Sequence, residues 1–142
     1  MIFFYRLRKA LFSIRKRKYR KQVGTYEYKK QKETIRNFVI ARVEHFNQFY
    51  NFTFNKITIR NSRTRWGSCS KKGNLNFNYR IISLPQQLQD YIVVHELCHL
   101  KEMNHSKSFW DLVAQVIPDY KKVKQILQEF RFEKSDPTPV DF

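Results

Sequence analysis

The run YIVVHELCHL, residues 91–100, limits the possible folds of this chain more than any other part of the sequence. Wound as a helix, it is apolar on nearly every side, and such a helix lies in the middle of a domain rather than on its surface. Its polar members include two histidines and one glutamate, and burying these groups without a purpose would cost free energy. The run therefore predicts a central, buried helix that carries chemically active side chains.

Hydrophobic periodicity predicts the elements that precede this helix. From residue 26 to about residue 50 the apolar residues recur at steps of three and four, which predicts a helix with one buried face. Alternation of apolar and polar residues in FTFNKITIR (52–60) and NLNFNYR (74–80) predicts two strands. TRWGSCS (64–70) continues in extended form between them. We therefore expect a small antiparallel sheet of about three strands.

The buried helix is followed by two further helices. Ser83 is placed to cap the buried helix, while KSFWDLVAQV (107–116) and DYKKVKQILQEF (119–130) predict the two that follow. We expect Phe109 and Trp110 to pack the first of these against the buried helix. The order of elements is a helix, a small sheet and then three helices, which indicates the α+β class.

The length and composition indicate one domain with a substantial core. The chain has 142 residues, of which 42% are hydrophobic. We expect the domain over residues 26–133, after a basic arm at 1–25 and before a flexible tail at 134–142. The two cysteines, Cys69 and Cys98, are too few for a disulfide framework and favour a reduced, cytoplasmic protein.

The net charge of +16 is concentrated at the N-terminus, because residues 1–22 hold nine Lys or Arg and no acidic residue. Three interpretations of this segment remain open. It can be a solvated, partly disordered tail, a binding segment for nucleic acid or another polyanion, or a basic amphipathic helix on a membrane surface. Its apolar runs are too short for a transmembrane segment.

Within the buried helix, HELCH at residues 95–99 follows the pattern H-E-x-x-H. His95 and His99 lie about 40° apart around a helix, so both imidazoles can reach one zinc ion at about 2.0–2.1 Å. Glu96 can then act as general base on a zinc-bound water. The alternative is a pair of hydrogen-bonded core histidines, which leaves Glu96 unexplained.

His105 is the candidate for a third metal ligand, because it follows six residues after His99, just past the predicted helix end. A chain that turns back there would supply three protein ligands and leave the fourth position open, as catalytic zinc requires. If His105 is instead a surface residue, Glu102 is the best substitute, since it lies one turn from His99. We expect the fourth histidine, His45, to be an ordinary half-buried residue on the first helix.

The segment TRWGSCS carries four candidate substrate-binding residues, Arg65, Trp66, Gly67 and Ser68. An extended substrate can add to a sheet edge, Gly67 would allow close backbone approach, and Arg65 can hold a carboxylate, a phosphate or an oxyanion. The alternative is structural, with Trp66 in the core, Gly67 in a bulge and Arg65 paired with an acid.

The blocks RWGSC, HELCH and NHSKSFW, in this order and spacing, resemble the YgjP-like zinc metallopeptidases, which are grouped with zincin-like WLM and SprT relatives. The resemblance covers about residues 26–130. It implies a zincin-like fold in which His95, His99 and His105 bind zinc and Glu96 is the catalytic base.

Three functions follow from these observations. The first is zinc-dependent hydrolysis of a peptide bond in a peptide or protein substrate. The second is hydrolysis of a phosphoanhydride in a nucleoside triphosphate, for which the basic charge is favourable; the family resemblance implies the same role, with UTP as one such substrate. The third is a nucleic-acid-binding protein with a structural zinc, against which the open coordination position and Glu96 argue.

Overall fold

The computed structural model describes residues 29–130 of the chain. The chain divides into two compact units, Met1–Lys32 and Glu33–Phe142. Of the first unit only the helical residues 29–32 are described, so the account below concerns the second. The expectations for the basic arm at 1–25 and for the tail at 134–142 lie outside the described residues.

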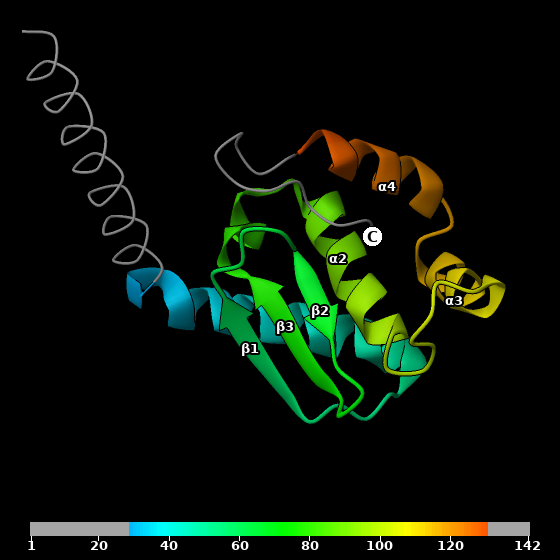
Figure 1. The fold of residues 1–142 in the computed structure, drawn as a ribbon, viewed down its shortest axis with the longest axis horizontal. Coiled ribbons are helices and arrows are strands. Elements are labelled where there is room, and N and C mark those ends of the chain that lie inside the picture. The colour runs from blue at the N-terminus through cyan, green and yellow to red at the C-terminus, as the bar shows by residue number, and fades with distance from the viewer. Residues whose placement is uncertain (1–28, 131–142) are drawn as a thin grey trace, which may run out of the picture. The chain divides into compact units, whose positions relative to one another are not determined.

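The elements follow the predicted order, and the α+β class is confirmed (Figure 1). A helix whose described residues end at residue 50 comes first. It is followed by β1 (Lys56–Arg60), β2 (Gly67–Cys69), β3 (Asn74–Asn78), the 3-10 helix η1 (Tyr79–Ser83), α2 (Gln86–Cys98), α3 (Lys107–Val116) and α4 (Tyr120–Glu129).

The sheet is mixed, so the prediction of a wholly antiparallel sheet was wrong. The strand order is β1-β3-β2; β2 pairs antiparallel with β3 through a tight turn, whereas β1 pairs parallel with β3. The reason is that residues 61–66 carry the chain from one edge of the sheet to the other. The side chain of Asn78 fastens this crossing segment, because its amide donates to the carbonyls of Ser62 at 2.8 Å and Arg65 at 2.9 Å.

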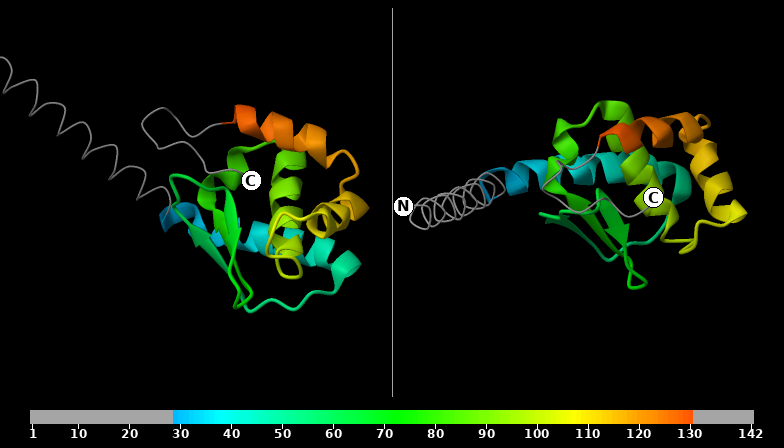
Figure 2. Two further views of the ribbon diagram at one scale, coloured as in Figure 1. Left: turned by 45° about the vertical axis from the view of Figure 1, so that its right-hand side comes forward. Right: turned by 45° about the horizontal axis from the view of Figure 1, so that its top comes forward.

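Helix α2 forms the centre of the second unit, as the apolar run predicted. All of residues 91–99 are buried, and α2 packs against β2, α3 and α4. The first helix runs behind the sheet in Figures 1 and 2. Its buried stripe includes Ile35, Val39 and Val43, at the spacing of four that one face of a helix requires.

The start of α2 differs from the prediction. Ser83 does not cap this helix but ends η1, where its hydroxyl donates to the carbonyl of Arg80 at 2.7 Å. Helix α2 begins at Gln86, directly after Pro85, whose missing N–H is no loss at a helix start.

Among residues 29–130, no helix has both the length and the apolar character that a membrane span needs. Cys69 and Cys98, the two cysteines of the chain, are both free thiols.

Candidate metal centre

His95 and His99 project from the same side of α2, near its C-terminal end. His95 lies in the last turn of the helix, and His99 is the residue at which the helix ends. Their Nε2 atoms are 3.1 Å apart. This proximity is the direct result of the four-residue spacing, which places successive side chains one above the other on a helix.

His105 comes from the segment that joins α2 to α3. The carbonyl of Cys98 accepts hydrogen bonds from two backbone N–H groups and closes the end of α2 in a tight turn. Ser106 then caps α3 with its side chain. Between these two points the chain turns back, so that Nε2 of His105 lies 3.1 Å from Nε2 of both His95 and His99.

The orientation of His99 is set by a hydrogen bond on its far side. Its Nδ1 lies 2.9 Å from the backbone carbonyl oxygen of Glu102. A carbonyl can only accept, so Nδ1 must carry the proton, and Nε2 is left with a free lone pair. A second partner of this kind is what fixes the tautomer of metal-binding histidines.

The three histidines suit a metal ion by their geometry and their protonation. Two nitrogen ligands of a tetrahedral zinc ion lie about 3.3 Å apart, close to the 3.1 Å between each pair of Nε2 atoms here. Burial, which is partial for His105, lowers the pKa of all three imidazoles below 6.5. The rings are therefore neutral at pH 7, as metal binding requires. The three histidines thus form a group of side chains, within the described part of the chain, that could hold a metal ion.

Aromatic rings from α3 and α4 hold the histidines in place. Phe109 is fully buried and stacks on His99, with ring centroids 4.5 Å apart. Trp110 stacks on His105 at 5.6 Å and on Tyr120 at 4.9 Å. The prediction that Phe109 and Trp110 pack α3 against the buried helix is thus confirmed, and their ring faces also support the candidate ligands.

Glu96 is a buried carboxylate with incomplete hydrogen bonding. The residue is 1% exposed, and its Oε2 has no hydrogen-bond partner in the described part of the chain. Burial raises its pKa from 4.5 to about 8, while the positive charge of Arg65 acts in the opposite direction. A cation held by the neighbouring histidines would lower this pKa further. A buried carboxylate without a fixed partner is typical of a functional site.

Gly67, the first residue of β2, lies directly against Glu96. A Cβ atom at this position would be 2.6 Å from Oε1 of Glu96 and 2.8 Å from its Cγ. Only glycine therefore leaves room for the carboxylate in its present place. Sequence reasoning proposed close approach at Gly67 but did not identify Glu96 as the neighbour. The only signal in the sequence was a glycine inside a predicted extended segment.

The other residues of the RWGSC block lie around this contact. Arg65 is exposed, and its charge acts on Glu96. Trp66 is 6% exposed and belongs to the core. The hydroxyl of Ser68 accepts a hydrogen bond from the Asn76 side chain at 3.3 Å. Substrate binding by these residues stays a prediction.

The two remaining candidates lie outside the histidine group. Glu102 contributes its backbone carbonyl to His99, and its carboxylate is not among the groups that could hold a metal in the described chain. His45 is exposed on the first helix, so the expectation of a half-buried residue was wrong. Its ring meets those of Phe46 and Phe49 edge-on.

Comparisons with solved structures identify the fold. The metallopeptidase zymogen abylysin of Pyrococcus abyssi aligns with a TM-score of 0.59 and 26% identity, over 65% of this chain and 93% of that one. The metallopeptidase zymogen jannalysin of Methanocaldococcus jannaschii aligns with a TM-score of 0.56 and 22% identity, over 65% of this chain and 96% of that one. At this level of identity, the second likeness concerns the fold alone.

Comparison with characterised sequences finds a relative that is named as a pyrophosphatase and not as a peptidase. The UTP pyrophosphatase of Escherichia coli K12 is 33% identical over 63 residues, which are 44% of this chain. The matched stretch spans only 38% of the length of that relative.

The sequence profile of the YgjP-like metallopeptidase domain matches residues 8–130, which is most of the chain. This match agrees with the metallopeptidase fold of the solved neighbours, and both support a metal-dependent hydrolase. The chain belongs to the YgjP-like metallopeptidase family.

Proposed function

We propose that this protein is a zinc-dependent peptidase, in which His95, His99 and His105 hold the zinc ion and Glu96 is the general base. The observation that carries the proposal is the carboxylate of Glu96, which is buried and has no hydrogen-bond partner for Oε2 among the described residues. It directly follows His95, one of three histidines whose Nε2 atoms converge. Burial of such a group is unfavourable unless the site uses it.

The residues divide the chemistry between them. A bound zinc ion supplies Lewis-acid chemistry, which polarises a carbonyl and lowers the pKa of water. Glu96 accepts a proton from the attacking water and later donates it to the leaving amine. Its buried position favours this work, because burial raises the pKa of the carboxyl above its ordinary value. Arg65, whose charge acts on Glu96, keeps the carboxylate from becoming too weak an acid.

A peptide substrate is favoured by the position of β2. This strand lies at one end of the strand order, and it pairs with β3 alone among the described strands. Its first residue, Gly67, meets the Glu96 side chain. An extended peptide that added to this edge as a further strand would pass close to the candidate base.

A second candidate function is hydrolysis of a phosphoanhydride by the same residues. It is favoured by the likeness to the UTP pyrophosphatase of Escherichia coli K12 and by the charge of Arg65 beside Glu96. A proton acceptor and a Lewis acid serve this reaction as well as they serve peptide hydrolysis. The substrate therefore has to be determined by assay.

The test compares zinc-loaded wild type with Glu96→Gln, and with His45→Ala as a control histidine outside the site. Casein, a mixed peptide pool and a panel of nucleoside triphosphates serve as substrates. We expect peptide cleavage that falls by roughly 10²–10⁴-fold in Glu96→Gln, the usual contribution of a general base. Zinc content and melting temperature should stay near those of wild type, because glutamine has nearly the same size.

Two outcomes would change the proposal. A folded, zinc-loaded Glu96→Gln variant with the wild-type rate would remove Glu96 from the mechanism. Hydrolysis of nucleotides without any cleavage of peptides would replace the first candidate function with the second.

A further inference from the structure

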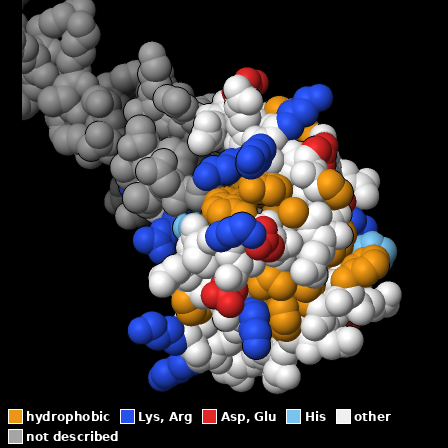
Figure 3. All heavy atoms as spheres, turned by 90° about the vertical axis from the view of Figure 1, so that its right-hand side faces the viewer, with side chains coloured by type: hydrophobic (Ala, Val, Ile, Leu, Met, Phe, Trp, Pro, Cys, Tyr) orange, Lys and Arg blue, Asp and Glu red, His pale blue; other side chains and the backbone are white. Residues whose placement is uncertain are grey.

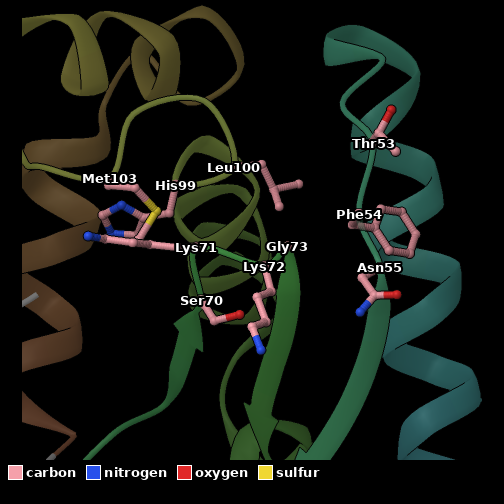
Figure 4. A pocket seen from close by; sticks show the side chains of 10 residues that line it. All are labelled: Thr53, Phe54, Asn55, Ser70, Lys71, Lys72, Gly73, His99, Leu100 and Met103. Carbon is pink, nitrogen blue, oxygen red and sulfur yellow. The ribbon is translucent and has the colours of Figure 1, made fainter.

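A pocket of about 690 Å³ lies between the metal centre and the turn that joins β2 to β3 (Figure 4). Its walls come from residues 53–55, from the turn at 70–73, and from the end of α2 with the chain that follows it. His99 is part of the lining. A group that entered this pocket would therefore lie one imidazole ring away from the candidate zinc site.

The pocket is held open by backbone hydrogen bonds that need no ligand. The N–H of Asn55 donates to the carbonyl of Gly73 at 2.8 Å, and the N–H of Gly73 donates to that of Ser70 at the same distance. Gly73 adopts φ = 73°, a conformation that glycine takes without strain. The side chains of Asn55 and Asn74 join the same two segments at 2.7 Å. Such preformed walls reduce the entropy lost on binding.

The charge of the pocket is positive. Lys71 and Lys72 both line it, and no acidic residue does. Neither lysine forms an ion pair within the described residues. They are also not needed to cap α2, because the carbonyls of Leu97 and Cys98 already accept backbone N–H groups. Both side chains are exposed, and Figure 4 shows their ammonium groups pointing to different sides. Either one, without an ion-pair partner among residues 29–130, is suited to an anionic ligand.

The remaining wall offers apolar surface beside this charge. Leu100 and Met103 line the pocket, and Met103 is 41% exposed. A glutamate side chain combines the matching features, since its methylene groups can pack on an apolar wall while its carboxylate accepts hydrogen bonds from lysine.

We propose that this pocket is a specificity subsite for an acidic side chain of the peptide substrate, with the ammonium group of Lys71 or Lys72 meeting its carboxylate. The inference rests on the proposed peptidase function, because it assigns a preference to the same site. The subsite lies on the His99 side of the metal centre and uses none of the residues that would hold zinc or accept the proton, apart from the ring of His99 in its wall.

The test measures binding and does not depend on turnover. Zinc-loaded Glu96→Gln protein is titrated, at near-physiological salt, with two end-capped peptide pools of equal length. One pool carries a single glutamate in each peptide, and the other carries glutamine instead. We expect the glutamate pool to bind about tenfold more tightly. This preference should disappear when Lys71→Ala and Lys72→Ala are combined.

The chain offers a matched control for this charge change. Lys121 and Lys122 form another exposed pair of adjacent lysines, on α4 and outside the pocket. Their double alanine variant lowers the net charge by the same amount and should keep the preference for glutamate. Zinc content and circular dichroism are recorded for every variant, so that a folding defect is recognised.

Each possible result either supports or overturns the proposed subsite. Equal binding of both pools, or a glutamate preference that survives in the Lys71/Lys72 variant, would overturn the inference. Titration with UTP covers the other source of an oxyanion. If UTP binding is lost in the Lys71/Lys72 variant while the two peptide pools bind alike, the pocket serves a nucleotide phosphate and the peptide subsite is refuted. Failure of the peptidase proposal itself would be seen separately, in the cleavage assay with casein.

Discussion

Gly67 and Glu96 come from different elements, yet the space beside Gly67 is filled by the Glu96 carboxylate. A Cβ atom at Gly67 would lie 2.6 Å from Oε1 of Glu96, which is too close for two unbonded atoms. In Gly67→Ala the carboxylate must therefore move or β2 must shift, at a cost of about 1–3 kcal/mol in the free energy of unfolding. We expect a lower melting temperature, a large loss of hydrolysis and an unchanged zinc content.

A compensating change separates this contact from a general effect on the strand. In the double variant Gly67→Ala with Glu96→Ala both Cγ and the carboxylate are absent, so the new methyl group has room and the melting temperature should equal that of Glu96→Ala alone. Ser68→Ala, at the next position of β2, should have little effect in the same measurements. A Gly67→Ala variant with wild-type melting temperature and rate would show that the contact does not matter.

The third metal ligand is predicted to be His105 and not Glu102. Nε2 of His105 lies 3.1 Å from those of the other two histidines, whereas Glu102 provides its backbone carbonyl to His99. We therefore expect His105→Ala to lose most of its zinc, as His95→Ala and His99→Ala should. Glu102→Ala should retain it, because the substitution leaves the backbone carbonyl in place.

Metal content by mass spectrometry after gel filtration checks this prediction. His45→Ala removes a histidine outside the group and should bind zinc like the wild type. The assignment fails if Glu102→Ala loses zinc while His105→Ala keeps it.

These contacts differ in how far they could be predicted from the sequence. The proximity of His95 and His99 follows from helix geometry alone, since four residues complete about one turn. The position of His105 required a turn signal, which MNHS supplied. The contact between Gly67 and Glu96 joins residues from a strand and a helix, and no local pattern reports such a pairing. The same holds for Lys71 and Lys72, which are separated from His99 in the sequence by β3 and most of α2.

At the scale of elements, one ion pair joins the first helix to the central helix. The guanidinium of Arg42 donates to Oδ1 of Asp90 through Nη2 at 2.6 Å and Nε at 2.9 Å. The two side chains are only 23% and 19% exposed, so solvent screens this pair less than an exposed one. We expect Asp90→Ala to lower the free energy of unfolding by about 1.5–3 kcal/mol, the usual value for hydrogen bonds to charged groups.

A second ion pair provides the control. Lys107 and Asp111 are 89% and 60% exposed and lie on one helix, where solvent screening leaves such a pair with little effect on stability. Urea unfolding should therefore show a much smaller effect for Asp111→Ala than for Asp90→Ala. Equal effects of the two substitutions would mean that the Arg42–Asp90 pair has no special role in joining the helices.

The elements themselves were predictable where their periodicity was local. The helices, β1 and β3 lie within the segments that the apolar pattern predicted, although β1 begins only at Lys56. The direction of β1 against β3 was not predictable, because it depends on the path of residues 61–66 across the sheet. Ser83 was misassigned because Pro85, and not Ser83, is the residue directly before α2, while the Ser83 hydroxyl donates to the carbonyl of Arg80 within η1.

At the scale of the whole molecule, the charge distribution raises a separate question. On the face of the molecule that Figure 3 displays, Lys and Arg side chains are scattered among hydrophobic and uncharged ones. In the sequence, by contrast, residues 1–22 contain nine basic residues and no acidic one. These residues lie outside the described part of the chain. A dense basic segment of this kind binds nucleic acid by releasing counterions from phosphates.

We predict that residues 1–22 contribute affinity for DNA or RNA that is independent of the zinc chemistry. The logarithm of the binding constant should fall linearly with the logarithm of the salt concentration. The slope is about −0.9 for each duplex phosphate that the protein contacts. Deletion of residues 1–22 should flatten this slope, because the remaining 19 basic residues are offset by 12 acidic ones.

A variant that keeps the segment but replaces its nine basic residues with glutamine separates the effect of charge from that of length. Zinc content should be the same in all three proteins, because the three histidines lie in the second unit. A salt slope that stays unchanged after deletion would leave residues 1–22 without a role in polyanion binding.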